Sequence, residues 1–224
     1  YNLSIYYPHT GGIMDYALVI LCGGNSTRMG TDKALLPFGE ECLIESIVKK
    51  YKPFFSHIYL SVKKKGDYAH LNLPVTEIAD IYPNAGPMSG VFSGLSMMDE
   101  PAAFFMSVDT PFLDPTTGIM LLESMEDSDI CMIEGKSGSI EPSTAAYSKN
   151  CTAAVGKCLL LRQFTFDTLQ EKCQTKYLTE SDIAEGIISQ FSDRTCETLP
   201  MNEQFFNLDT RSDYYQALRK LGSI

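Results

Sequence analysis

Short apolar strands alternate with amphipathic helices from residue 16 to residue 134, and this alternation constrains the fold more than any other feature. The pattern predicts strands at residues 16–22, 57–62, 75–79, 103–108 and 130–134, with helices at 43–51, 88–98 and 115–125. The first of these helices carries Leu43, Ile44, Ile47 and Val48 on one face. Alternation at this spacing predicts an α/β fold, with a mostly parallel twisted sheet and helices on both of its faces.

The pattern is less regular after Gly135. We predict strands at residues 143–147, 195–199 and 205–208, mostly helical structure at 150–174, and a last helix at 212–221. Asp213 near the start of that helix, with Arg219 and Lys220 near its end, complements the helix dipole. We interpret Met14 as the natural start, residues 1–13 as an expression-derived or disordered extension, and residues 14–224 as one domain.

Composition argues against several classes of protein. The 224 residues carry a formal net charge of −10, whereas a nucleic-acid-binding domain is usually basic. No apolar run reaches the roughly 18 residues that a membrane span needs. The seven cysteines include no C-x-x-C pair, and the three histidines show no ligand spacing. We therefore expect reduced thiols in a cytoplasmic protein, without a zinc site.

The segment after the first strand has the residue types of a phosphate-binding loop. It runs L-C-G-G-N-S-T-R-M-G-T-D-K-A-L-L-P from Leu21 to Pro37. Glycines let backbone N–H groups approach an anion, hydroxyls add donors, and basic side chains supply the positive charge that a triphosphate requires. In open α/β sheets, ligands bind at the carboxyl ends of the strands, where this loop lies. The candidate groups are Gly23, Gly24, Ser26, Thr27, Arg28 and Lys33.

Neither of the two commonest phosphate-binding motifs is present. Gly30 is followed by Thr31, and not by the lysine of G-x-x-x-x-G-K-[ST]. Gly23 and Gly24 are adjacent, whereas a dinucleotide fingerprint requires G-x-G-x-x-G. On residue types alone, a plain glycine turn is therefore an open alternative.

Two aspartates follow predicted strands and are candidate ligand-binding residues. Asp80 precedes the turn Gly86-Pro87, and its carboxylate can accept hydrogen bonds from guanine N1–H and N2–H₂; a turn or cap role is the alternative. Asp109 ends an apolar strand, where a charge is costly unless it has a partner. It suits Mg²⁺, which is typically held by one or two carboxylates plus substrate phosphates, and a helix cap is the alternative.

The loop closely resembles the signature of the molybdenum cofactor guanylyltransferases, L-A-G-G-x-S-x-R-M-G-x-D-K-x-L. Related sugar-phosphate and cytidylyltransferases usually have L-A-A-G-x-G-x-R-M with a proline before the lysine, whereas Asp32 precedes Lys33 here. In the molybdenum cofactor enzymes of this group, a glycine at the place of Gly23 accompanies GTP and an alanine accompanies CTP. The resemblance therefore implies GTP, with Cys22 replacing the usual alanine.

Three later segments also resemble this family. Residues 80–90 resemble D-x-x-x-x-x-G-P-L-x-G, and residues 107–112 resemble C-D-x-P-F/Y, with Val108 in place of the usual cysteine. Residues 205–213 resemble F-x-N-x-N-T-x-x-D/E-L. The resemblance implies Arg28, Lys33 and Asp109 as catalytic residues, and Asp109 as metal ligand with Asn207 as a further candidate. The nucleotide-binding set that it implies is Leu21, Cys22, Gly23, Gly24, Ser26, Lys33, Ser61, Asp80, Gly86, Pro87 and Asp109.

The chain also departs from the family pattern. Ser61 stands where the family often has an asparagine that helps to bind nucleotide, and Asp209 stands where asparagine is usual. Glu141 replaces the common histidine of an H-P-x-x-A-L-Y element that ends here at Tyr147. This element is a candidate for the acceptor side. The run of lysines at residues 63–65 is either a solvated turn or a site that attracts phosphate.

The resemblance implies a GT-A-type nucleotidyltransferase that uses Mg²⁺ to transfer GMP from GTP to the terminal phosphate of molybdopterin. The first half of the chain would bind nucleotide and the second half the acceptor. Cofactor-assembly proteins and acceptor molybdoenzymes are possible further partners, and nucleic acid and membrane are not. A cytidylyl- or sugar-phosphate nucleotidyltransferase is the first alternative, against which Gly23 and Asp32-Lys33 argue. A GTP-binding accessory protein without catalysis is the second, against which Lys33 and Asp109 argue.

Overall fold

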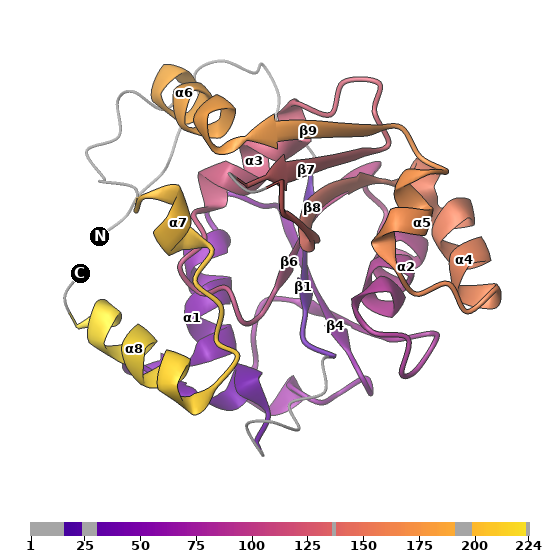
Figure 1. Cartoon of the computed structure of the whole chain (residues 1–224). Helices are drawn as coiled ribbons and strands as arrows, with labels where there is room; N and C mark the ends of the chain where they lie inside the picture. The colour runs from indigo at the N-terminus through magenta and orange to yellow at the C-terminus, as the bar shows by residue number, and fades with distance from the viewer. Residues whose placement is uncertain (1–15, 24–30, 136–137, 191–198, 223–224) are drawn as a thin grey trace.

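A seven-stranded sheet forms the centre of the molecule (Figure 1). The computed structural model describes residues 16–23, 31–135, 138–190 and 199–222. The strands lie in the order β5-β4-β1-β6-β8-β7-β9, and β8 alone runs antiparallel to its two neighbours. In chain order the strands are β1 (Ala17–Leu21), β4 (His57–Val62), β5 (Thr76–Ala79), β6 (Ala102–Ser107), β7 (Ile130–Glu134), β8 (Ile140–Ser148) and β9 (Thr175–Thr179).

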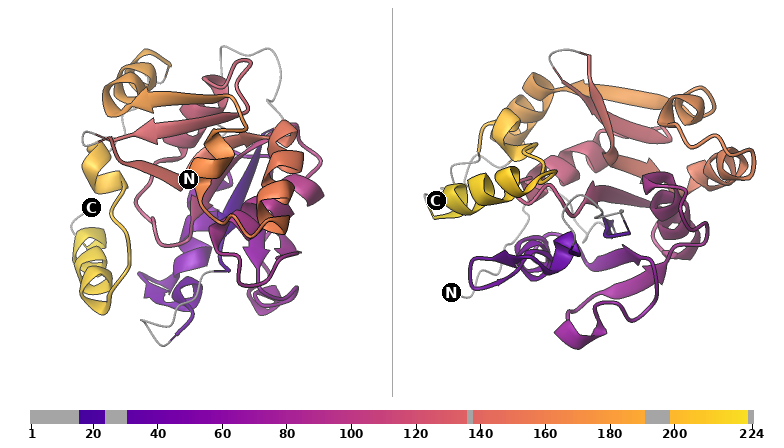
Figure 2. Two further views of the ribbon diagram at one scale, coloured as in Figure 1. Left: turned by 45° about the vertical axis from the view of Figure 1, so that its right-hand side comes forward. Right: turned by 60° about the horizontal axis from the view of Figure 1, so that its bottom comes forward.

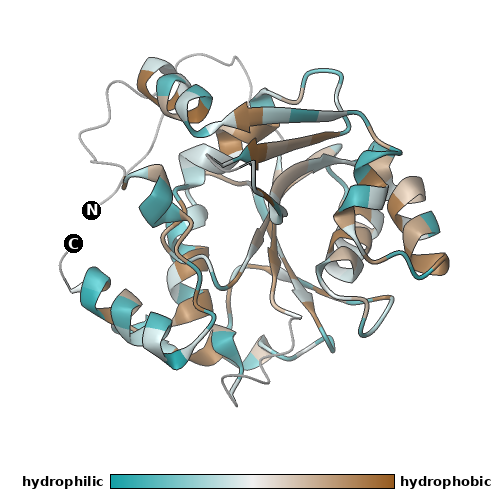
Figure 3. Cartoon of the chain, in the orientation of Figure 1, coloured by the Kyte–Doolittle hydropathy of each residue, from teal (hydrophilic) through white to brown (hydrophobic). Residues whose placement is uncertain are grey.

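Helices cover both faces of this sheet (Figures 1 and 2). One face packs against α1 (Leu43–Tyr51), α3 (Pro115–Glu123), α6 (Glu180–Gln190) and α8 (Arg211–Leu221). The other packs against α2 (Pro87–Met97), α4 (Thr152–Leu160) and α5 (Phe166–Gln170). Successive side chains of β1 alternate between these two cores, with Leu18 and Ile20 in the first and Val19 and Leu21 in the second. All five residues of β1 are buried, so apolar character is concentrated in the central strands (Figure 3).

Several short elements connect the main ones. A small antiparallel hairpin pairs β2 (Pro37–Phe38) with β3 (Glu41–Cys42), and a short helix α7 (Met201–Gln204) precedes α8. The 3₁₀ turns among the described residues are η2 (Lys33–Leu35), η3 (Ala69–Leu71) and η4 (Lys149–Cys151). Within the described residues, no helix has both the length and the apolar character needed to cross a membrane.

The predicted alternation from residue 16 to residue 134 is confirmed, with element boundaries within two residues of those expected. The strand predicted at 143–147 lies within β8, the helical region at 150–174 contains α4 and α5, and the last helix is α8. The mostly parallel α/β sheet is likewise confirmed.

One predicted strand is wrong, and several elements were not predicted. Residues 205–208 follow α7 as a turn and an irregular segment outside the sheet. Their apolar side chains serve packing instead, since Leu208 is fully buried and Phe206 lies edge-on to Phe112. Strand β9 and helix α6 were not predicted from the sequence. The strand predicted at 195–199 lies outside the described residues, apart from Leu199, which is not in a strand.

Candidate active site

A cavity of about 330 Å³ opens at one edge of the sheet. The carboxyl ends of β1, β4, β5 and β6 meet at this edge, and the antiparallel β8 begins there. This arrangement brings together residues that lie up to 188 positions apart, from Leu21 to Asp209. The residues that line the cavity are Leu21, Ser61, Asp80, Gly86, Pro87, Gly90, Ser107, Asp109, Glu141, Ser143, Asn207 and Asp209.

Asp80 lies against the backbone of Gly23. A Cβ atom added to Gly23 would stand 2.7 Å from Asp80 Oδ2, closer than real Cβ contacts allow. Ser61 donates its hydroxyl hydrogen to Asp80 Oδ1 over 2.6 Å. Backbone hydrogen bonds fix both partners, because Cys22 N–H donates to Ser61 O and Asp80 N–H donates to Val62 O. Burial raises the pKa of the Asp80 carboxyl, against the lowering effects of the Ser61 hydrogen bond and Lys63.

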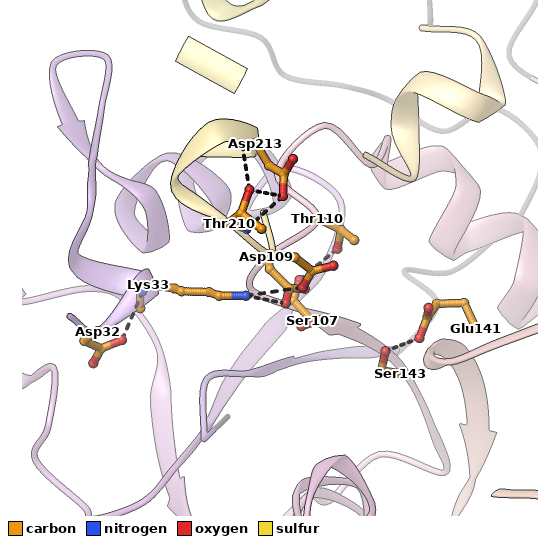
Figure 4. Close-up of polar contacts among 11 residues, drawn as sticks. Asp32, Lys33, Ser107, Asp109, Thr110, Glu141, Ser143, Thr210 and Asp213 are labelled. Atoms are coloured by element: carbon orange, nitrogen blue, oxygen red, sulfur yellow. Dashed lines mark hydrogen bonds and ion pairs between the residues drawn. The ribbon is translucent and has the colours of Figure 1, made fainter. Parts of the chain in front are cut away.

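Lys33 reaches toward Asp109 (Figure 4) and also toward Asp209, which comes from a distant part of the chain. Its Nζ lies 3.2 Å from Asp109 Oδ2 and 3.7 Å from Asp209 Oδ1. The Lys33 side chain is only 15% exposed, so this ion pair is less screened than one on the surface. Asp32 fixes the turn that carries Lys33, since it accepts from Ala34 N–H over 3.0 Å and from the Tyr68 hydroxyl over 2.8 Å.

The segment between α7 and α8 is attached to the loop that carries Asp109. Leu208 N–H donates to Asp109 O over 2.9 Å, and the Leu208 side chain is buried in the core. This anchor puts Asn207 and Asp209 on the cavity wall. Asp213 has a structural role, because it forms a capping box with Thr210 at the start of α8 (Figure 4).

The remaining walls come from α2 and β8. Gly86 precedes α2 with φ 67° and ψ −159°, a conformation that favours glycine, and Pro87 occupies the first turn of the helix. On β8, the Ser143 hydroxyl donates to the Glu141 carboxylate, and both residues line the cavity (Figure 4). The Tyr147 hydroxyl donates to Pro142 O over 2.7 Å, which holds the start of β8 in place.

The cavity brings together many, but not all, of the residues proposed from the sequence. Those on its wall are Leu21, Ser61, Asp80, Gly86, Pro87, Asp109 and Asn207. Gly23 and Lys33 adjoin it through Asp80 and Asp109. The side chain of Cys22 packs in the core, with its thiol directed to Ile20 O. Gly24, Ser26 and Arg28 lie outside the described residues, and the structure adds Gly90 and Ser107 to the set.

Carboxylate and amide oxygens are the metal-binding groups that the cavity offers. No group of three or more His, Cys, Asp or Glu side chains suited to a metal occurs in the part of the chain that the structure describes. Asp109 and Asp209 nevertheless converge on one cationic group, the Lys33 ammonium. This oxygen set fits a Mg²⁺ ion that takes its other ligands from substrate phosphates and water. The cysteines of the described residues are all free thiols.

Comparison with the models of known protein families shows to which family this chain belongs. Residues 18–170 match the model of the MobA-like NTP transferase domain, where NTP stands for nucleoside triphosphate. The chain belongs to the MobA-like NTP transferase family. The match begins in β1 and ends in α5, so it contains Gly23, Asp80 and Asp109. The expected nucleotidyltransferase class is therefore confirmed.

MobA-like relatives cover nearly the whole chain. A "Probable molybdenum cofactor guanylyltransferase" from Carboxydothermus hydrogenoformans is 30% identical over 207 residues, which are 92% of this chain and 97% of the relative. A protein of the same name from Pelotomaculum thermopropionicum is 26% identical over 89% of this chain and 90% of its own length. Both similarities extend beyond residue 170, where the match to the family model ends.

Solved structures share the fold at low sequence identity. Molybdopterin-guanine dinucleotide biosynthesis protein A from Archaeoglobus fulgidus superposes with a TM-score of 0.75 at 19% identity, over 93% of this chain and 100% of its own. A 2-C-methyl-D-erythritol 4-phosphate cytidylyltransferase from Thermus thermophilus reaches 0.63 at 13% identity, over 93% and 100%. The Rossmann-like nucleotidyltransferase fold expected from the sequence is thus confirmed.

Proposed function

We propose that this protein transfers GMP from GTP to the terminal phosphate of molybdopterin, releasing pyrophosphate and forming molybdopterin guanine dinucleotide. The observation that carries the proposal is the pairing of Asp80 with Gly23 in a MobA-like chain. A carboxylate in this place accepts hydrogen bonds from guanine N1–H and N2–H₂. An alanine at position 23 would displace that carboxylate, because its Cβ would meet Asp80 Oδ2 at 2.7 Å.

The span of the cavity suits a nucleoside triphosphate. Asp80 follows β5 and Asp109 follows β6, and these strands are separated by β4 and β1. Three strand spacings correspond to about 14 Å. A guanine at Asp80 therefore leaves room for the ribose and phosphates to extend toward Lys33 and Asp109.

In this arrangement the protein contributes binding, orientation and electrostatic stabilisation. The Lys33 ammonium neutralises phosphate charge, and Asp32 and Tyr68 hold the turn that carries it. We propose that Asp109, with Asp209 and Asn207 beside it, would hold Mg²⁺, which would supply positive charge to offset the negative charge of the triphosphate. We propose that the Arg28 side chain also neutralises negative charge on the triphosphate.

A general base is not required for this reaction. The attacking group is a phosphate monoester, which is already anionic at neutral pH. Attack on the α-phosphorus in line with the leaving pyrophosphate depends chiefly on positioning and charge stabilisation. We assign the nucleotide to the first half of the chain and the acceptor to the second, with Glu141 and Ser143 on the acceptor side. We also place the reaction in the cytoplasm, where cysteines such as those of this chain stay reduced.

Pyrophosphate release with purified protein, Mg²⁺ and molybdopterin tests the proposal when GTP, CTP and ATP are compared side by side. We expect release with GTP and little with CTP or ATP. Release with CTP would retain the reaction class but contradict the role of Asp80 and Gly23. Tight GTP binding without release from any nucleotide would instead identify an accessory GTP-binding protein.

A further inference from the structure

Ser61 lies near the end of β4, on the wall of the cavity beside Asp80. The Ser61 residue is only 1% exposed, although it borders the cavity. Its hydroxyl has one hydrogen to donate, and that hydrogen goes to Asp80 Oδ1 over 2.6 Å. Ser61 is therefore poorly placed to donate to a nucleotide. Its short side chain acts on the carboxylate beside it.

We propose that Ser61 is a positioning residue that sets the base specificity of the site by fixing the orientation of the Asp80 carboxylate. This inference rests on the proposed function, because it assigns Ser61 a role in guanine selection. Ser61 holds Oδ1, and the backbone of Gly23 leaves just enough space for Oδ2. The carboxylate is thus held from both sides, with its oxygens in fixed positions for the two donors of the guanine edge.

The backbone of helix α2 limits the movement of the Ser61 hydroxyl. A Cβ atom added to Gly90 on α2 would lie 2.6 Å from Ser61 Oγ and 2.6 Å from Leu21 Cδ2. Gly90 itself is buried, so the helix backbone closes that side of the pocket. The Ser61 backbone is fixed as well, because Ser61 lies opposite Leu21 and Ile78 in the sheet and its carbonyl accepts from Cys22 N–H. Ser61 therefore has little freedom to turn away from Asp80.

Ordering of the carboxylate matters because guanine recognition requires two acceptors at once. GTP offers N1–H and N2–H₂, whereas ITP offers N1–H alone. A freely rotating carboxylate still accepts one hydrogen bond, but it must lose rotational freedom to accept two. The hydrogen bond from Ser61 restricts rotation of the Asp80 carboxylate before GTP binds. It also lowers the pKa of Asp80, which favours the ionised carboxylate that accepts hydrogen bonds. Loss of the Ser61 hydroxyl should therefore harm GTP binding more than ITP binding.

Steady-state kinetics with GTP and ITP test this role in Ser61→Ala and Ser61→Thr. For Ser61→Ala we expect the KM for GTP to rise by roughly 2- to 10-fold, the size expected for ordering one side chain on binding, with kcat nearly unchanged. The preference for GTP over ITP should fall, and the acid limb of the KM profile for GTP should move to higher pH. Ser61→Thr retains the hydroxyl, so its preference for GTP over ITP and its acid limb should resemble those of the parent.

A buried hydroxyl elsewhere serves as the matched control. Thr117 on α3 is fully buried and donates to Gln204 Oε1 over 3.0 Å, and it is not among the residues that line the cavity. Thr117→Val should lower stability without changing the GTP-to-ITP preference or the acid limb. An unchanged preference and pH profile in Ser61→Ala would overturn the positioning role, provided that the parent protein turns over GTP. A parent that turns over no nucleotide would contradict the proposed function itself.

Discussion

At the scale of single residues, Lys33 supplies the ammonium group that we propose neutralises phosphate charge. Its ammonium is held by Asp109 at 3.2 Å and by Asp209 at 3.7 Å. Lys33→Ala should lower turnover by roughly 10²–10³-fold, which is the usual effect of removing one group that stabilises developing negative charge. Lys176→Ala, which removes a lysine paired with Glu126, should leave turnover unchanged. Comparable rates for Lys33→Ala and the parent would remove Lys33 from the catalytic set.

A second residue-scale prediction concerns the pH dependence of GTP binding. Burial raises the pKa of Asp80, so this carboxyl takes up a proton at a higher pH than an exposed aspartate does. Protonation replaces an acceptor with a donor, and the KM for GTP should therefore rise as the pH falls through that pKa. The same shift means that Asp80 favours folding in its protonated form, so its contribution to stability falls as the pH rises.

The measurement is the KM for GTP as a function of pH in the parent and in Asp80→Asn. The variant carries an amide that does not titrate, so its profile should lack the acid limb and its KM should be high throughout. An acid limb that is identical in the two proteins would show that another group titrates and would contradict this role of Asp80.

At the scale of elements, helix α1 supports the loop that carries Asp109. Lys50 donates to Pro111 O over 2.6 Å and to Leu113 O over 2.7 Å, and the Tyr51 hydroxyl donates to Leu113 O over 2.9 Å. Lys50→Met would leave two loop carbonyls without this partner. We expect it to lower the free energy of unfolding by about 1.5–3 kcal/mol, the range for hydrogen bonds made by charged groups.

The pH dependence of unfolding separates Lys50 from a general packing effect. Burial lowers the pKa of Lys50 to about 8, from its ordinary value of 10.5. The unfolded chain then binds more protons between these two values, so stability from this group should rise with pH across that interval. Lys50→Met should lose this rise, and Lys49→Met, which removes an exposed pair with Glu41, should keep it. If the free energy of unfolding depends on pH in the same way in Lys50→Met and in the parent, the lowered pKa of a buried Lys50 ammonium is contradicted.

Elements differ in how well the sequence predicts them. Strand β1 is buried along its whole length, and a run of apolar residues is the pattern that such a strand imposes. Strand β9 lies at the edge of the sheet and is half-exposed, so Thr175–Thr179 shows little apolar periodicity. Residues 205–208 have strand-like composition because Leu208 and Phe206 anchor an irregular segment to the core. Burial, and not strand pairing, explains their apolar character.

At the scale of the whole molecule, one sheet edge collects the candidate site from five strand ends. Asp80 and Asp109 are predictable from the sequence, because each lies within two residues of the end of a predicted parallel strand. The contact between Ser61 and Asp80 and the approach of Asp209 to Lys33 are not predictable from composition or periodicity. They depend on how segments distant in the sequence meet, and only the folded chain reveals them.

Identification of the transferred group tests most directly whether the protein transfers GMP to molybdopterin. The measurement is mass spectrometry of the product formed from molybdopterin, Mg²⁺ and GTP labelled in the guanine ring. We expect molybdopterin bearing a labelled GMP group on its terminal phosphate, in amounts equal to the pyrophosphate released. Pyrophosphate release without labelled molybdopterin, or equally efficient formation of a CMP-bearing product when CTP replaces GTP, would contradict GMP transfer.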